Sequence, residues 1–164
     1  MSTLQVSVGY RLSQRLKDKI DQEAAKYPSR RAAVKSALRY CQEESGWISR
    51  DIVEAVAEFL NLKSIEVYEV ATFYDMFYTE PVGRHQIRVC TNVSCMLRGS
   101  EEIVSHLHNK LGIEFGETSS DGRISLFEAE CLGACAAAPM LICGKEYVEN
   151  LTTEKLDVFL DQLD

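Results

Sequence analysis

The first half of the chain has the apolar spacing of amphipathic helices. Leu12, Leu16 and Ile20 recur every four residues in a segment that stops before Pro28. Three further segments have helical spacing, and each opens at a serine: Ser29, Ser49 and Ser64. Short connections separate these segments, so we expect a compact helical bundle domain over residues 1–80.

Beyond the linker EPVG (80–83), apolar and polar residues alternate in some segments, and this period of two is typical of strands. The order of the expected elements is β-α-β-β-β-α, which predicts a thioredoxin-like α/β domain over residues 81–164. The fold class is therefore α+β. Strands are predicted at 86–90, 122–130, 140–143 and 146–149, and helices at 99–111, with Ser100 at its N-cap, and at 153–163.

The composition is that of a globular protein, with 46% hydrophobic and 26% charged residues. No apolar run is long enough to cross a membrane, and the first residues have no apolar signal segment, so we expect a cytoplasmic chain without direct membrane insertion. A net charge of −7 argues against nucleic acid as a partner. In a cytoplasmic protein, the six cysteines are expected to be metal ligands or redox groups rather than disulfides.

Four of the cysteines form two close pairs at the ends of the first two predicted strands. Cys90 and Cys95 have the spacing C-x4-C, and Cys131 and Cys135 have the spacing C-x3-C. If the two strands are parallel neighbours, both loops emerge at one sheet edge and the four sulfurs can converge. Gly133 and the alanines around it would let backbone N–H groups approach the sulfurs.

Spacing alone leaves two metal centres open. A [2Fe–2S] cluster takes four thiolates and favours backbone donors around its sulfurs. A structural zinc ion also takes closely spaced cysteine pairs, which would make the chain an interaction module. A dithiol redox site is a weaker alternative, because neither pair has the C-x-x-C spacing.

The remaining cysteines and the histidines are not expected to be ligands. Cys41 and Cys143 fall on apolar faces, where cysteine behaves as a small hydrophobic residue. A Rieske centre would need two histidine ligands, but His106 and His108 do not share a helix face and His85 stands alone. We interpret all three as surface or satisfied histidines.

Two motifs together resemble a known family. The stretch from Cys90 to Ser100 (CTNVSCMLRGS) and the stretch CLGAC (131–135), followed by Ala138-Pro139, resemble the thioredoxin-like [2Fe–2S] component of respiratory complex I, its E or 24 kDa-type subunit. The resemblance runs from about residue 12 to the C-terminus. Further matching stretches are YPSRRAA (27–33), SGWI (45–48), VATFY (70–74) and EPVGR (80–84).

The resemblance implies an electron carrier of NADH:quinone oxidoreductase. Cys90, Cys95, Cys131 and Cys135 would bind one [2Fe–2S] cluster. FMN and NADH would bind to a partner flavoprotein, and other subunits of the peripheral arm would be further partners, on the cytoplasmic side of the inner membrane. The chain has no G-x-G-x-x-G motif. Similar subunits serve NAD-dependent formate dehydrogenases and hydrogenases, and that alternative stays open.

Three smaller expectations accompany this interpretation. A thioredoxin-like fold predicts a cis peptide bond at Ala138–Pro139. Side chains next to the cysteines, such as Met96 and Leu97, would set solvent access to a bound cluster. The outward-facing arginines of the helical half are either solvated or pair with acidic groups of a partner; they are Arg30, Arg31 and Arg39.

Overall fold

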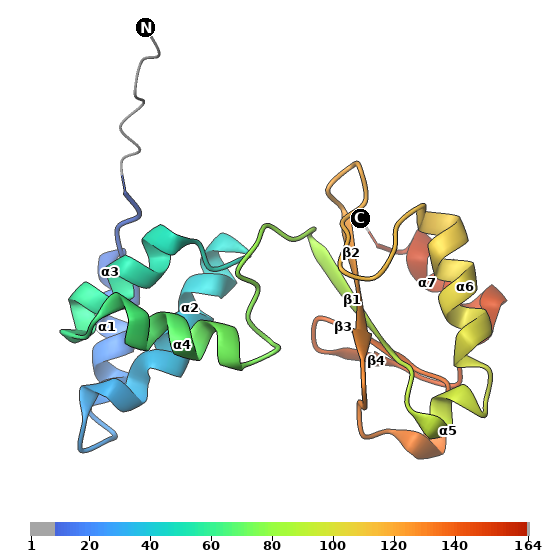
Figure 1. Cartoon of the computed structure of the whole chain (residues 1–164), viewed down its shortest axis with the longest axis horizontal. Coiled ribbons are helices and arrows are strands. Elements are labelled where there is room, and N and C mark those ends of the chain that lie inside the picture. Colours follow the sequence, from blue (N-terminus) through green and yellow to red (C-terminus); the bar gives the residue numbers. More distant parts are fainter. Residues whose placement is uncertain (1–8, 164) are drawn as a thin grey trace, which may run out of the picture. The chain divides into compact units, whose positions relative to one another are not determined.

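A computed structural model describes residues 9–163, and the chain divides into two compact units, Met1–Pro81 and Val82–Asp164. The first unit is helical and the second combines a sheet with helices (Figure 1), which confirms the predicted α+β fold class. Among the residues described, no helix combines the length and the apolar character needed to span a membrane.

The helical unit contains the four predicted helices: α1 (Gln14–Ala24), α2 (Val34–Ser45), α3 (Arg50–Leu60) and α4 (Ser64–Phe73). Local signals explain their ends. The Ser49 hydroxyl accepts a hydrogen bond from the Ile52 N–H and so caps α3, which ends at Asn61 in the left-handed conformation. Ser29 caps a 3-10 turn, η1 (Arg30–Ala33), rather than α2 itself, so the predicted second helix begins later than expected.

The core of the helical unit is built from the apolar faces that the sequence pattern indicated. Each helix contributes residues that are almost completely removed from solvent, and Cys41 lies among them. The innermost side chains are those of Leu16, Ile20, Leu38, Ile52, Val56, Leu60 and Val67.

The second unit is a four-stranded sheet with the order β2-β1-β3-β4. β1 pairs parallel with β2 and antiparallel with β3, and β3 forms a hairpin with β4. Helices α6 and α7 lie on one side of the sheet (Figure 1). The elements are β1 (His85–Cys90), α5 (Val93–Met96), α6 (Ser100–Leu111), β2 (Ile124–Ala129), η2 (Cys135–Ala137), β3 (Leu141–Cys143), β4 (Glu146–Val148) and α7 (Thr153–Asp161).

The apolar side chains of β1 and β2 pack against α6 and α7. Ile87 and Leu126 are completely buried on the sheet, and Leu107 and Leu156 are completely buried on the two helices. Within residues 9–163, this second core shares no residue with the core of the helical unit.

The expected N-cap of α6 is wrong. Gly99, in the left-handed conformation with φ 92°, occupies the cap position, and Ser100 is the first residue of the helix with only 2% exposure. The second strand is shorter than the predicted 122–130, because Gly122 and Arg123 belong to the turn that precedes Ile124 and Glu130 already belongs to the bend before Cys131. The short helices α5 and η2 were not predicted, since a single turn shows no apolar periodicity.

Candidate metal centre

The two cysteine loops leave the sheet at the same edge. Cys90 is the last residue of β1 and pairs in register with Ala129, the last residue of the parallel strand β2. Cys131 follows two residues later. The Thr91 N–H extends the pairing by donating to the Ala129 carbonyl at 3.1 Å. The condition for the two loops to emerge at one sheet edge, that these strands are parallel neighbours, is therefore met.

The first loop turns back immediately so that Cys95 comes close to Cys90. The Asn92 side chain caps the short helix α5 by accepting from the Val93 N–H at 2.9 Å. This turn buries Cys95, which is 2% exposed, next to Cys90, which is 4% exposed. Both cysteines pack against Ala138 and Met140 from the second half of the site. Two thiols from the first pair thus face residues that follow the second pair.

The electrostatics of Cys95 reflect this crowding. Burial raises the pKa of the Cys95 thiol to about 11, and the hydrogen-bonded Cys90 thiol and the nearby Cys135 contribute to the rise. The Met140 backbone N–H donates to the Cys95 sulfur and opposes it. A backbone N–H aimed at a sulfur is a contact that thiolate ligands of a metal centre use.

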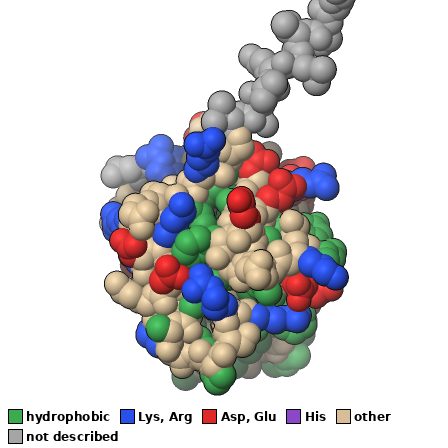
Figure 2. Space-filling view, turned by 90° about the vertical axis from the view of Figure 1, so that its left-hand side faces the viewer, with side chains coloured by type: hydrophobic (Ala, Val, Ile, Leu, Met, Phe, Trp, Pro, Cys, Tyr) green, Lys and Arg blue, Asp and Glu red, His purple; other side chains and the backbone are tan. Residues whose placement is uncertain are grey.

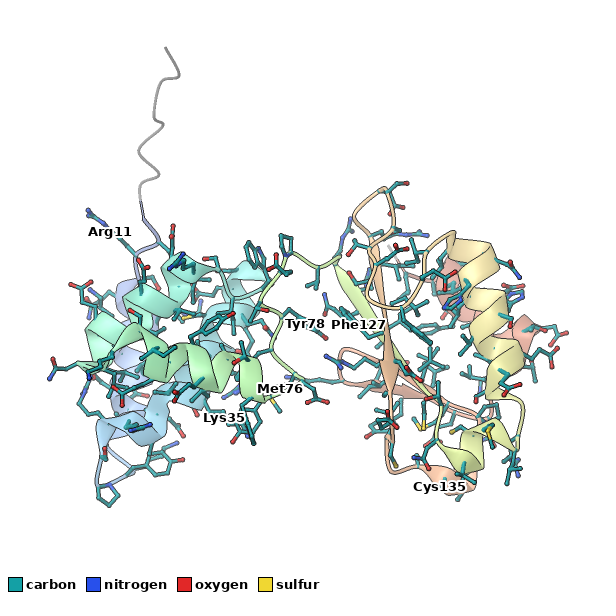
Figure 3. All side chains as sticks on the ribbon, in the orientation of Figure 1. Arg11, Lys35, Met76, Tyr78, Phe127 and Cys135 are labelled. Carbon is teal, nitrogen blue, oxygen red and sulfur yellow. The ribbon has the colours of Figure 1, made fainter. Side chains whose placement is uncertain are left out.

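The second loop presents its two cysteines to solvent. Cys131 and Cys135 are both exposed, whereas Cys90 and Cys95 are buried. Gly133 between them has φ 78°, a conformation that favours glycine and turns the loop. Cys135 opens η2, at the end of the unit where α5 lies (Figure 3). The peptide bond Ala138–Pro139 is cis, as predicted.

The structure brings three of the four predicted ligands close together. Cys90 and Cys95 are in hydrogen-bond contact, and Cys135 is near enough to influence the pKa of Cys95. Cys131 lies on the same loop as Cys135, on the solvent side. Within residues 9–163, no group of three or more His, Cys, Asp or Glu side chains has the geometry to hold a single metal ion.

The donor set nevertheless fits a binuclear cluster. Such a cluster distributes four thiolates over two irons, two on each. The chain offers two pairs of cysteines, one inner and one outer, on loops that start from neighbouring strand ends. A Gly- and Ala-rich second loop leaves backbone amides free of intervening side chains.

The cysteines and histidines that were set aside lie elsewhere. Cys41 is completely buried in the core of the helical unit, and Cys143 is partly buried on β3. His106 pairs with Asp157 at 2.7 Å, so the expectation of a satisfied histidine is confirmed for it. His108 contacts Glu114 through Nδ1 at 3.0 Å, but its buried Nε2 has no hydrogen-bond partner among the described residues. His85 begins β1, at the opposite end of the strand from Cys90.

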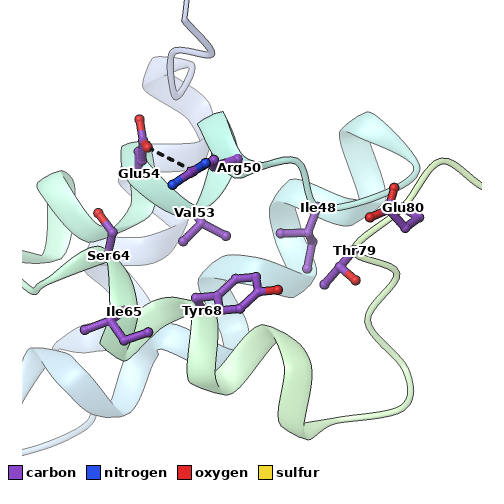
Figure 4. A pocket seen from close by; sticks show the side chains of 9 residues that line it. All are labelled: Ile48, Arg50, Val53, Glu54, Ser64, Ile65, Tyr68, Thr79 and Glu80. Carbon is purple, nitrogen blue, oxygen red and sulfur yellow. Dashed lines mark ion pairs between the residues drawn. The ribbon is translucent and has the colours of Figure 1, made fainter.

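A pocket of about 590 Å³ lies in the helical unit (Figure 4). Its polar groups include Arg50 and Glu54, which form an ion pair at 3.7 Å. It contains no cysteine or histidine, and we assign it no redox role. The lining residues are Ile48, Arg50, Val53, Glu54, Ser64, Ile65, Tyr68, Thr79 and Glu80.

The three outward-facing arginines pair with carboxylates of the chain itself. Arg30 contacts Asp21 at 2.8 Å, Arg31 contacts Glu66 at 2.9 Å and Arg39 contacts Glu43 at 2.8 Å. Basic and acidic side chains are interspersed on the face shown in Figure 2. These exposed pairs contribute little to stability.

Two side chains that brace the second cysteine loop were missed in the sequence. The Tyr147 hydroxyl donates to the Leu132 carbonyl at 3.2 Å, and the Arg98 Nε–H donates to the Ala138 carbonyl at 2.7 Å. Both contacts join residues far apart in the chain. No local pattern signals them.

Comparison with known proteins agrees with the arrangement of the two cysteine loops. The thioredoxin-like [2Fe-2S] ferredoxin family matches residues 20–164, which include all four cysteines. The chain belongs to this family. The resemblance drawn from the cysteine motifs is thereby confirmed, and the ferredoxin fold accounts for the sheet that carries both loops.

Individual relatives of this ferredoxin chain are similar over most of its length. The second E subunit of the NADH-quinone oxidoreductase of Rhizobium meliloti (strain 1021) is 45% identical over 146 residues, covering 89% of this chain and 87% of the relative. The E subunit of the NADH-quinone oxidoreductase of Rickettsia bellii (strain RML369-C) is 43% identical, covering 84% of each. NADH dehydrogenase [ubiquinone] flavoprotein 2, mitochondrial, of Dictyostelium discoideum is 40% identical, covering 88% of this chain and 60% of the relative.

A solved structure shares the fold of this ferredoxin. A chain of the NAD+-reducing [NiFe]-hydrogenase in the air-oxidized state superposes with a TM-score of 0.71 at 21% identity, over 79% of this chain. This chain spans 22% of that hydrogenase chain. The likeness concerns the fold alone.

Proposed function

We propose that this chain is the electron-transfer subunit of an NADH:quinone oxidoreductase and carries one [2Fe–2S] cluster. The observation that carries the proposal is the parallel register of Cys90 with Ala129, which places both cysteine loops at one sheet edge. Relatives at 40–45% identity that bear the name of complex I subunits support the same assignment.

In this proposal the iron ligands are Cys90, Cys95, Cys131 and Cys135. When bound, the cluster supplies one-electron transfer. The chain itself positions the sulfurs, supplies the Met140 N–H to the Cys95 sulfur, and excludes water from the inner pair by burial. The outer pair remains close to the surface, where an electron can be exchanged with a partner.

The partner is a flavoprotein that binds NADH and FMN, within the peripheral arm on the cytoplasmic side of the inner membrane. Large apolar side chains are exposed around the first cysteine loop, which suits a protein contact. Leu97 is 77% exposed, Val93 60% and Met96 45%. We further propose that residues 1–80 and 81–164 are the two domains of the chain, with the second carrying the cluster.

A diaphorase subunit of an NAD-linked hydrogenase or formate dehydrogenase is the second candidate. The fold shared with the NAD+-reducing hydrogenase favours it, whereas the relatives at higher identity are complex I subunits. The one-electron step of this chain would be the same in either complex.

The decisive experiment is a spectrum of protein purified without air, before and after dithionite, with iron, acid-labile sulfide and zinc assayed on the same sample. Visible bands that bleach on reduction, with about two irons and two sulfides per chain, are expected. A colourless protein with one tightly bound zinc would contradict the electron-carrier function and would indicate a structural zinc module instead. NADH-dependent bleaching after addition of the flavoprotein then tests the partner.

A further inference from the structure

We propose that Arg98 is a positioning residue that holds the two cysteine loops together and that its charge favours the reduced cluster. The inference rests on the proposed [2Fe–2S] function. It adds a role for a side chain that is not a ligand.

Arg98 links the turn that carries Cys95 to Ala138, which follows Cys135, through its own hydrogen bonds. Its backbone N–H donates to the Cys95 carbonyl at 3.1 Å, and its Nε–H donates to the Ala138 carbonyl at 2.7 Å. Ala138 in turn donates its N–H to the Cys135 carbonyl at 3.4 Å. A single residue, through its backbone N–H and its side chain, therefore joins the turn that carries Cys95 to the turn that carries Cys135.

The accepting carbonyl belongs to a residue at the centre of the site. Ala138 is completely buried and packs against Cys90, Cys95 and Met140. The carbonyls on either side of it accept from the backbone: Ala137 from the Asn150 N–H at 2.7 Å and Pro139 from the Leu151 N–H at 2.9 Å. Arg98 thus supplies from the first loop a donor that complements those two backbone donors.

The Arg98 guanidinium also places a positive charge next to the Ala138 carbonyl. Although Arg98 is an exposed residue, its hydrogen bond to Ala138 is partly buried. Among the described residues, no carboxylate forms an ion pair with it. Reduction adds one negative charge to a cluster, so an unneutralised cation beside the ligand loops stabilises the reduced form and raises the midpoint potential.

The test compares three variants of the full chain, each with its cluster. R98Q removes the charge, and R98K keeps the charge but lacks the Nε–H. R84Q is the matched control, because it makes the same change of net charge at the other end of β1. At about 3.3 Å per residue, Arg84 lies about 20 Å from Cys90, beyond the range of unscreened interaction at physiological salt.

Two quantities are measured: the midpoint potential in a dye-mediated titration and the rate of cluster loss to an iron chelator. R98Q should have a more negative potential than the wild type and lose its cluster about ten-fold faster, as expected for the loss of a charged hydrogen bond. R84Q should match the wild type in both. R98K should keep the wild-type potential and lose its cluster faster than the wild type.

The outcomes separate this inference from the function on which it rests. Wild-type protein without iron and sulfide would overturn the proposed function and the role of Arg98 with it. An intact wild-type cluster, with R98Q equal to R84Q in potential and in cluster loss, would overturn the role of Arg98 alone. Should R98Q not fold, a wild-type rate of cluster loss in R98K would overturn the positioning role.

Discussion

Cys90 on β1 stands directly opposite Ala129 on β2, in a parallel register that continues over six residue pairs. Because both strands end at this pair, the two cysteine loops begin side by side. Cys90 and Cys131 are 41 residues apart in the sequence, but their loops begin on neighbouring strands of the sheet.

Substitution of the proposed ligands should abolish the cluster, whereas substitution of other cysteines should not. Cys131→Ala removes one of four thiolates, and we expect loss of most of the visible absorbance and of the bound iron. Cys143→Ala is the matched control, since Cys143 is partly buried on β3 and is not in the ligand set. Iron and sulfide assays of both variants provide the measurement. A full cluster in Cys131→Ala would remove that residue from the ligands.

Gly83 is required by the close approach of the linker to β2. An added Cβ would lie 2.9 Å from the backbone carbon and nitrogen of Ile124, which cannot move aside as a flexible side chain could. The Gly83 N–H also donates to the buried Ser125 hydroxyl at 2.7 Å. We expect Gly83→Ala to lower the free energy of unfolding of the second unit by about 1–3 kcal/mol.

The control for that prediction is Gly9→Ala, because a Cβ at Gly9 would meet nothing within 4 Å. Urea denaturation of both variants, followed by circular dichroism, gives the comparison. Equal midpoints for the two would show that the Gly83 contact is relieved by a shift of the backbone.

Cys41 should be chemically inert in the folded protein. Burial raises the pKa of its thiol to about 11, so only about one molecule in a thousand carries the thiolate at pH 8. Iodoacetamide at pH 8 should modify the exposed Cys131 of the apoprotein and leave Cys41 untouched until the protein unfolds. Mass spectrometry of the peptides distinguishes the two sites, and equal rates would contradict the burial of Cys41.

The same pKa predicts how stability depends on pH. The folded state holds the Cys41 proton more tightly than the unfolded state, whose thiol titrates near 9.0. The stabilising contribution of the neutral thiol is therefore complete below pH 9 and declines between about pH 9 and pH 11. The Cys41→Ala variant should lack this part of the alkaline decline in urea denaturation midpoints. An unchanged pH profile would assign the decline to other groups.

The cap of α3 is worth a measurable amount of stability. The Ser49 hydroxyl accepts from the Ile52 N–H at 3.3 Å, and Ser49→Ala should cost about 1 kcal/mol. Ser64→Ala is a suitable comparison, because Ser64 is the first residue of α4 while Lys63 occupies its cap position. We expect a change within about 0.5 kcal/mol for that variant. Thermal melts of both variants give the comparison. Equal melting temperatures would show that the Ser49 cap contributes nothing to stability.

Much of the fold was readable from local pattern. The helix ends at Gly46 and Asn61 and the cap at Ser49 follow from residue types that favour those backbone conformations. The hairpin across Gly144 and Lys145 was also predicted, and the strands around it pair as expected. The start of α6 differs from the prediction. Gly99, in the left-handed conformation, occupies the N-cap position that was predicted for Ser100, and Ser100 is buried.

The sequence by itself determined the helical and sheet segments, the two cysteine pairs and the family to which they point, because these depend on side chains close together in the chain. Only the tertiary structure decided that β3 joins the sheet beside β1, that Cys95 is buried against Met140, and that Arg98 reaches Ala138. Such contacts join residues 40 to 56 positions apart, and their partners are selected by packing over the whole unit rather than by any local preference.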